Sequence, residues 1–287
     1  MKWNIAMLVA ALVACGSDGP DAPRVEVAAA DVRSLESGDV VGRWSLELGS
    51  LPSGITVAPA TGPPLVLYYE GRLVELASGV ELGVFVPPFV RTGFADVAAL
   101  GRGLLALTAV SDGYIASLVD GSLVPHFCYE PGWFDDELDA VQLSGALALD
   151  VRHDRLFTQP LTVTNGGFGT TVEGFFSTYD LSSGVDTQWW RTPDPSFVAT
   201  GMVVLDAGET PGETTLLVAQ GDRLLRFDVA SRALTPLVSL AEVGLSFLNG
   251  IARDDVAGTL LVVGSGEDLD VPPEVVEIPL DAVLQRH

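Results

Sequence analysis

The fold is decided by residues 200–228, which contain the runs Thr200-Gly201-Met202-Val203-Val204-Leu205, Thr215-Leu216-Leu217-Val218-Ala219 and Asp222-Arg223-Leu224-Leu225-Arg226-Phe227-Asp228. Each run is short and apolar for most of its length, and turn-forming residues such as Gly, Pro and Asp separate the runs. This combination is typical of β-strands, and no long window shows the helical spacing of apolar residues except residues 280–285. The segment therefore predicts a small sheet within an all-β domain.

The same order of runs recurs along the chain, so that the sequence contains five similar units. The other four units have their runs at residues 53–57, 65–69 and 71–76; 96–100, 104–107 and 114–118; 144–149, 155–158 and 175–180; and 249–252, 259–263 and 274–278. Repetition at about 40 to 55 residues with several strands per unit is typical of a β-propeller, because one small sheet cannot bury both of its faces alone. We therefore predict an all-β fold, a β-propeller with five blades.

Closure of the ring is predicted to need a strand from the N-terminal part of the domain. The last unit lacks an outer strand, and residues 42–48 form a spare strand before the first unit. Pairing of the two would close the ring and cover an exposed strand edge. A sixth blade hidden in residues 22–39 or 128–142, a β-sandwich and an irregular barrel stay open as alternatives.

The N-terminus has the layout of an export signal. Lys2 precedes an unbroken apolar run over residues 5–14, which is too short to span a membrane, because a spanning helix needs about 20 apolar residues. The run ends in Leu12-Val13-Ala14-Cys15, which resembles the lipobox of bacterial lipoprotein precursors at all four positions. The resemblance implies cleavage before Cys15 and diacylglycerol on its thiol. An ordinary secretory signal is the alternative.

The chain is expected to divide into three parts on this basis. Residues 1–14 are the signal peptide, residues 15–40 are the lipidated cysteine with a flexible tether, and residues 41–287 are the propeller domain. The acyl chains would hold the protein on a membrane permanently. Gly16 rather than aspartate follows the cysteine, which in the lipoprotein family favours the outer membrane over the inner membrane. We therefore expect a cell-envelope location.

The composition is strongly acidic. The chain has 38 acidic and 15 basic residues, a formal net charge of −23, and its sole lysine, Lys2, lies in the expected signal peptide. Such a surface repels phosphate groups and anionic lipid head groups. The composition argues against nucleic acid as a partner and leaves the lipid on Cys15 as the expected membrane contact.

Cys128 has no partner for an intramolecular disulfide once Cys15 carries lipid. His126 precedes it by two residues, and alternate residues of a strand share a face, so a nucleophile with a base beside it is one interpretation. A packed, inert thiol is the favoured interpretation, because free cysteines are usually buried and unreactive.

Candidate ligand-binding residues come from the start of each predicted inner strand, which would line the mouth of a central channel. They are Ser53, Asp96, Ser144, Thr200 and Asn249. The set is polar, mostly uncharged and short of acid–base groups or clustered metal ligands, so we predict no catalytic residue, no metal and no cofactor. The alternative interpretation is that these side chains bond to the backbone at strand starts.

The last units also resemble known enzymes. The runs over residues 248–252, 258–264 and 276–280 look like the last blade of bacterial and plant glutaminyl cyclotransferases, which are five-bladed propellers. Residues 222–228 are similar to the fourth blade of that family and to blades of the gluconolactonase and regucalcin family. The resemblance covers about the last 90 residues and consists as much of general propeller features as of family motifs.

Only Asn249 carries over from these families, as the position of a metal ligand in gluconolactonases. Ser265 stands where the cyclotransferases have a lysine, and Thr200-Gly201-Met202 stands where they have an acidic Asn-Glu-Leu motif. Ser53 occupies the place of the first glutamate ligand of the gluconolactonases. The resemblance therefore implies the scaffold of these enzymes without their catalytic groups.

Two acidic loops and four aromatic residues complete the set of candidates. Residues 135–139 and 267–270 are rich in carboxylates, but neither spacing matches a calcium-binding loop, so solvated charge is the favoured interpretation. The aromatic residues could form a platform for a carbohydrate or a peptide, or could pack in the core. They are Trp133, Phe134, Trp189 and Trp190.

These observations favour a lipid-anchored, cell-envelope propeller that binds a protein, a peptide or a glycan without catalysis. The alternative is a divergent propeller hydrolase, lactonase or cyclotransferase-like enzyme that uses Asp96, Asn249 and a loop carboxylate. A passive structural lipoprotein is a third possibility. The side chains that line the central channel decide between these functions, because catalysis needs carboxylates, or a histidine with a carboxylate, converging there.

Overall fold

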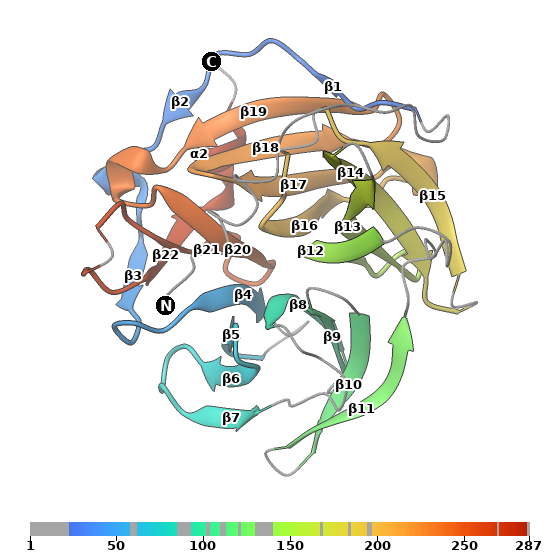
Figure 1. Cartoon of the computed structure of the whole chain (residues 1–287). Coiled ribbons are helices and arrows are strands. Elements are labelled where there is room, and N and C mark those ends of the chain that lie inside the picture. Colours follow the sequence, from blue (N-terminus) through green and yellow to red (C-terminus); the bar gives the residue numbers. More distant parts are fainter. Residues whose placement is uncertain are drawn as a thin grey trace.

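The computed structural model describes residues 23–57, 62–84, 93–101, 104–109, 113–119, 122–129, 140–166, 169–182, 185–193, 197–268 and 270–285. Their strands form five sheets, which stand side by side around a central axis (Figure 1). The arrangement is that of a β-propeller and confirms the predicted fold class. Cys15 and the expected signal peptide, residues 1–14, lie outside the described residues.

Each of the first four sheets, in chain order, is built from four consecutive antiparallel strands, beginning with the strand nearest the axis. They are β4 (Pro52–Val57), β5 (Pro64–Tyr68), β6 (Arg72–Glu75) and β7 (Glu81–Val84); β8 (Phe94–Gly101), β9 (Leu104–Ala109), β10 (Gly113–Val119) and β11 (Ser122–Tyr129); β12 (Ala140–Asp150), β13 (Arg155–Gly166), β14 (Gly169–Asp180) and β15 (Val185–Arg191); and β16 (Gly201–Asp206), β17 (Thr215–Gln220), β18 (Arg223–Asp228) and β19 (Ala233–Ser239).

The fifth sheet closes the ring with a strand from the N-terminal side. It contains β20 (Phe247–Asp254), β21 (Thr259–Ser265), β22 (Glu274–Pro279) and β3 (Gly42–Ser45). β3 pairs antiparallel with β22, so that Gly42 faces Glu277 and Ser45 faces Glu274. This pairing confirms the predicted closure, and it covers an edge that would otherwise expose unpaired backbone groups.

Residues 23–39, which we call the N-terminal strap, run along the outer edge of the ring (Figure 1). The strap supplies β1 (Glu26–Val27) and β2 (Arg33–Ser34), both parallel to β19, and a 3-10 turn, η1 (Ser37–Asp39). Val25 and Leu35 of the strap are 3% and 0% exposed. The sixth blade considered for residues 22–39 is therefore wrong, and the part of the expected tether from residue 23 onward packs against the domain.

Two features of the third sheet go beyond the predicted pattern. The Gly- and Thr-rich insertion between the second and third runs does not form a loop but lengthens β13 and β14 into a hairpin, in which Gly166 faces Gly169. The segment considered as a hidden blade at 128–142 ends in β12, and residues 130–139 of it lie outside the described residues.

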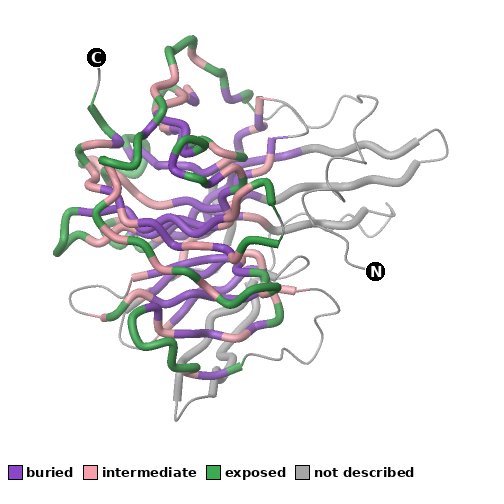
Figure 2. Tube along the Cα trace, turned by 90° about the vertical axis from the view of Figure 1, so that its left-hand side faces the viewer, coloured by how far each residue is buried: buried purple, intermediate pink, exposed green. Residues whose placement is uncertain are grey.

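The core lies between neighbouring sheets, where buried residues of adjacent blades pack against one another. Figure 2 shows the buried positions concentrated along the strands. Between the third and fourth sheets, Phe176 stacks on Phe227 at 4.6 Å between ring centroids, and Trp190 meets Phe227 edge-on at 6.0 Å. Trp190 is 6% exposed, which confirms core packing for this residue and removes it from the candidate platform. Aromatic pairs of this geometry hold adjacent blades together beyond the burial of their area.

Short helical segments complete the described fold. The predicted helical window is confirmed by α2 (Leu280–Leu284), and two further 3-10 turns are η2 (Pro211–Glu213) and η3 (Ala241–Val243). Within the residues that the structure describes, none of the helices has the length and hydropathy that a membrane span requires.

Candidate functional site

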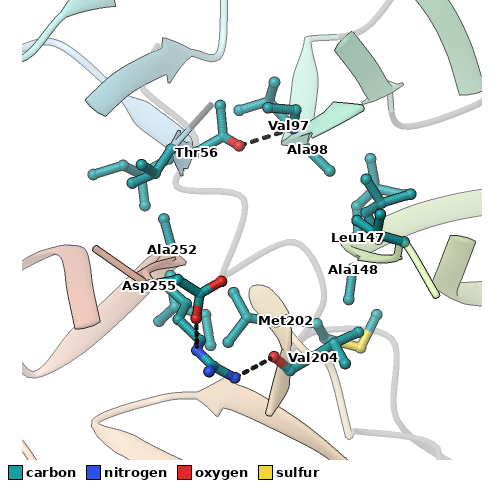
Figure 3. Close-up of a pocket in the computed structure, with 17 residues that line it drawn as sticks. Thr56, Val97, Ala98, Leu147, Ala148, Met202, Val204, Ala252 and Asp255 are labelled. Carbon is teal, nitrogen blue, oxygen red and sulfur yellow. Dashed lines mark hydrogen bonds and ion pairs between the residues drawn. The ribbon is translucent and has the colours of Figure 1, made fainter. Parts of the chain in front are cut away.

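A pocket lies on the ring axis near the C-terminal ends of the five innermost strands (Figure 3). Its empty space is about 560 Å³, part of which is open to solvent. The lining residues are Ile55, Thr56 and Val57; Val97, Ala98 and Ala99; Leu147, Ala148, Leu149 and Val151; Met202, Val203 and Val204; and Ile251, Ala252, Arg253 and Asp255. Each inner strand contributes three consecutive residues to the lining, and Val151 and Asp255 come from the loops after β12 and β20.

The lining is aliphatic apart from three side chains, Thr56, Arg253 and Asp255. It includes no aromatic ring and no histidine among the described residues. Burial of an apolar ligand group against these side chains would contribute to the free energy of binding, at about 25 cal/mol per Å² of apolar surface removed from water. The side chains around the pocket are thus mostly apolar, but most of them are buried between the blades, and the surface that the pocket itself presents is more polar than apolar.

Below the pocket the inner strands approach one another so closely that several positions have no room for a side chain. A Cβ atom on Gly250 would lie 2.8 Å from the Cα atom of Gly54, and one on Gly201 would lie 2.7 Å from the backbone nitrogen of Ile251. Glycine is required here because backbone meets backbone. The repeated glycine of the sequence units therefore marks the depth at which the strands converge.

Asp96 takes the place of this glycine in β8. Its carboxylate is 1% exposed and accepts hydrogen bonds from the backbone nitrogens of Val97 and Leu147, both at 2.8 Å. Leu147 belongs to β12, so the carboxylate joins the second sheet to the third. Burial raises the pKa of Asp96 well above its usual range, although the two hydrogen bonds act in the opposite direction. A carboxylate that is buried and hydrogen-bonded to two backbone groups is not placed to act on a substrate.

Other buried polar side chains near the axis also hold the backbone of neighbouring sheets. Thr56 Oγ1 accepts a hydrogen bond from the nitrogen of Ala99 at 2.9 Å, and Thr108 Oγ1 donates to the carbonyl of Gly145 at 2.9 Å. Gln159 Nε2 donates to the carbonyl of Phe197 at 2.7 Å. These three bonds give partners to buried backbone groups of the next sheet or of the segment that precedes it, since a buried backbone group without a partner is costly.

Arg253 and Asp255 form the charged part of the pocket. Arg253 Nη1 donates to the carbonyls of Val204 and Leu205 at 3.2 and 2.5 Å, and Asp255 Oδ1 lies 2.6 Å from Arg253 Nε. The side chains are 30% and 74% exposed, respectively. Figure 3 shows Asp255 and Val204 beside each other at the edge of the ring. The arginine is thus fixed to β16, whereas the aspartate stands on the exposed loop after β20.

The predicted channel residues lie at or near the starts of the inner strands, except Ser144, which lies within β12, and none of them lines this pocket. Ser53 Oγ donates to the carbonyl of Leu67 at 3.4 Å, and Thr200 Oγ1 donates to that of Ala219 at 3.3 Å. These contacts bear out the alternative interpretation for both hydroxyls. Asn249 is half-buried, and the side chain of Ser144 lies outside the described residues. A ligand-binding role for the set stays a prediction.

A histidine–carboxylate pair is present, but it is not in the pocket lining. Asp150 is 0% exposed, and its Oδ2 atom lies 2.9 Å from His153 Nδ1, 3.1 Å from Arg155 Nε and 3.1 Å from Thr214 Oγ1. Burial alone would raise the pKa of Asp150, but the hydrogen bonds from His153 and Arg155 outweigh burial and lower it. The cluster fastens the loop after β12 to the segment before β17 and therefore joins the third sheet to the fourth.

The remaining candidates do not form a site among the described residues. β11 contains both His126 and Cys128, and its register against β10 shifts between Phe127 and Pro125, but the side chains of the two candidates lie outside the described residues. No group of three or more potential metal ligands gathers within the described ranges. The acidic segment 135–139 and two of the aromatic candidates, Trp133 and Phe134, lie outside those ranges, as does the side chain of Trp189.

The sequence analysis missed Arg253, although the sequence contains a signal for it. At the end of the inner-strand run the units have Val57, Ala99, Leu149 and Val204, whereas the fifth unit has arginine. A cation in a row of aliphatic residues is an exception that alignment of the units would have shown. It was overlooked because the start of each strand, rather than its end, was taken as the channel mouth.

Comparison with known proteins reveals likeness of fold only. No protein-family profile and no curated protein sequence matches the chain. Regucalcin from Agrobacterium tumefaciens, described as a calcium-binding protein, is 16% identical with a TM-score of 0.48, over 88% of this chain and 97% of that one. A glucose dehydrogenase is 13% identical with a TM-score of 0.46, over 83% of this chain and 99% of that one.

A bacterial signalling protein gives a further match. The extracellular domain of a one-component system from B. thetaiotaomicron is 10% identical with a TM-score of 0.45, over 80% of this chain. This chain spans only 28% of the length of that protein. At such identities and TM-scores, the likenesses assign no activity to this chain.

Proposed function

We propose that the chain is a lipid-anchored propeller of the cell envelope that binds an apolar segment of a peptide or protein in its axial pocket, without catalysis. The aliphatic lining of the pocket is the observation that carries this proposal. A glycan is the alternative ligand, because the pocket also presents polar surface. The enzymatic alternative lacks a favourable observation, since Asp96 is sealed and the Asp150–His153 pair lies outside the lining.

The lipid anchor is a proposal and not an observation, because Cys15 lies outside the described residues. It is supported by the lipobox residues 12–15 and by the acidic composition, which offers no basic patch for binding lipid head groups. The packing of the strap from residue 23 leaves residues 16–22 as the tether. Seven residues span at most about 25 Å when fully extended, so the domain would stay close to the membrane.

Replacement of Cys15 with alanine is expected to release the protein from membranes. In a bacterium that processes lipoproteins, the wild type should incorporate an alkyne-labelled fatty acid and sediment with membranes, and Cys15→Ala should do neither. Cys128→Ala, which removes the other cysteine, should retain both properties. Labelling that survives in Cys15→Ala, or a wild type without label, would contradict the anchor.

Binding of an apolar residue is tested with fluorescent Gly/Ser hexapeptides that carry one leucine, placed at each position in turn. Burial of a leucine side chain contributes about 1.5 to 3 kcal/mol, so the best leucine peptide should bind roughly 10- to 100-fold more tightly than its serine counterpart. Fluorescence anisotropy measures the difference. If no leucine peptide exceeds its serine counterpart, the proposed function is wrong.

The location of binding is tested by filling the pocket. Val57→Phe adds bulk to a half-buried lining residue and should reduce leucine-peptide binding at least about tenfold. Val27→Phe makes the same change at an exposed position of the strap and should leave binding unchanged. Far-UV circular dichroism verifies that both variants are folded. Equal binding by Val57→Phe and the wild type would place the binding site elsewhere.

A further inference from the structure

Among the described lining residues Arg253 is the one cation, and the structure holds it in place. Its Nη1 atom donates to two backbone carbonyls of β16, those of Val204 and Leu205. An arginine that is fixed before a ligand arrives loses little conformational freedom on binding. The position beside aliphatic walls also weakens solvent screening, which strengthens its attraction for an anion.

The guanidinium has donor capacity that the protein does not use fully. Arg253 Nε is buried and makes no hydrogen bond with the described residues, although Asp255 Oδ1 lies 2.6 Å away as an ion-pair partner. A guanidinium presents five N–H groups, and its Nε–Nη2 edge suits a carboxylate that binds through both oxygens. The hydrogen bonds on Nη1 leave this edge to Asp255, whose carboxylate lies at Nε.

Asp255 is the group that an incoming carboxylate would displace. It is 74% exposed, on the loop after β20, and an exposed ion pair contributes at most about 1 kcal/mol, so the aspartate can turn to solvent at little cost. The converse arrangement, a cationic ligand on Asp255, is weaker because no hydrogen bond fixes that carboxylate among the described residues and solvent screens it. The stronger recognition element is therefore the arginine.

Resting on the proposed function, we infer that the axial pocket binds an apolar residue that ends in a free carboxylate, as at the C-terminus of a polypeptide. The last side chain lies among the aliphatic residues, and the carboxylate pairs with Arg253. Basic residues preceding that end are favoured, because Asp255 is exposed beside Arg253 and the chain as a whole carries −23.

The inference is tested with the hexapeptide Ser-Gly-Ser-Gly-Ser-Leu as the free acid and as the C-terminal amide. We expect the acid to bind at least about tenfold more tightly than the amide, because a charge-assisted pair is lost in the amide. N-acetyl-leucine distinguishes a small free carboxylate from a polypeptide end, and it should bind more weakly than the hexapeptide acid. Equal binding of acid and amide overturns the inference, as does equal binding of N-acetyl-leucine and the hexapeptide acid.

Variants assign the preference to Arg253. Arg253→Gln should abolish the difference between acid and amide, whereas Arg152→Gln, at an exposed arginine paired with Glu209 outside the lining, should preserve it. Asp255→Asn leaves Arg253 in place and removes its competing partner, so it should tighten binding of the acid several-fold without tightening binding of the amide. The Asp255→Asn variant tests the inference even if Arg253→Gln does not fold. Unchanged or weaker binding of the acid by Asp255→Asn overturns the inference.

The two levels of the proposal fail in different ways. If leucine peptides bind better than serine peptides but acid and amide bind equally, the proposed binding of an apolar residue is supported and the proposed role of Arg253 is wrong. If no leucine peptide binds better than its serine counterpart in either form, the proposed function falls with it.

Discussion

Replacing Gly250 with alanine is expected to destabilise the protein by about 3 kcal/mol, because the new methyl group would meet rigid backbone rather than a movable side chain. Its Cβ atom would lie 2.8 Å from the Cα atom of Gly54 and 3.1 Å from the nitrogen of Ile55. Relief would require β20 and β4 to separate. These strands connect the last sheet to the first, so the change acts on ring closure.

Urea unfolding followed by tryptophan fluorescence measures the loss. The matched control is Gly38→Ala in η1, where a Cβ atom would meet nothing within 4 Å, and a change within about 0.5 kcal/mol is expected. Neither glycine has the positive φ that would add backbone strain to the alanine variant. Equal stability of the two variants would show that the inner strands are not packed so closely at the axis.

The repeated order of strands could be predicted from the sequence because the inner strands of each sheet are continuous apolar runs. The outer strands were not identified, since prolines at edges and bulges interrupt a strand pattern. β19 contains Pro236, and β11 contains Pro125, each beside a shift in register. The strap was missed as well, because its parallel pairing with β19 joins segments about 200 residues apart and has no local signal.

The candidate site was predicted less well than the fold. Alignment of the units showed which residues share a depth, but it did not show that the pocket is at the C-terminal ends of the inner strands. Asp96 was identified as the polar residue of a unit without glycine. Its hydrogen-bond partners, however, are the backbone nitrogens of Val97, the next residue in the same strand, and of Leu147 in the neighbouring sheet. Whether a carboxylate faces solvent or backbone depends on such tertiary contacts, which residue spacing does not specify.

Replacing Asp150 with asparagine is expected to destabilise the protein by about 3 kcal/mol at pH 7, because Arg155 would lose its carboxylate partner while remaining buried. Arg155 is 5% exposed, and Asp150 is 0% exposed. Arg155 Nη2 keeps its hydrogen bond to Thr214 Oγ1 at 2.8 Å, and it also donates to the carbonyl of Pro211, so the arginine stays anchored but its charge is not neutralised. Thermal and urea unfolding measure the loss, and Asp154→Asn, at an exposed neighbour, serves as the control.

The pH dependence separates loss of charge from loss of shape. The pKa of Asp150 is lowered in the folded state from the ordinary value of 3.8, so its ionised form contributes stability above that value and the contribution is lost as pH falls through the lower, folded pKa. The gap in stability between wild type and Asp150→Asn should therefore be full at pH 7 and narrow below about pH 4. A gap that stays constant into acid would assign the effect to packing of the loop. Because Val151 of the same loop lines the pocket, the variant should also bind leucine peptides more weakly at neutral pH.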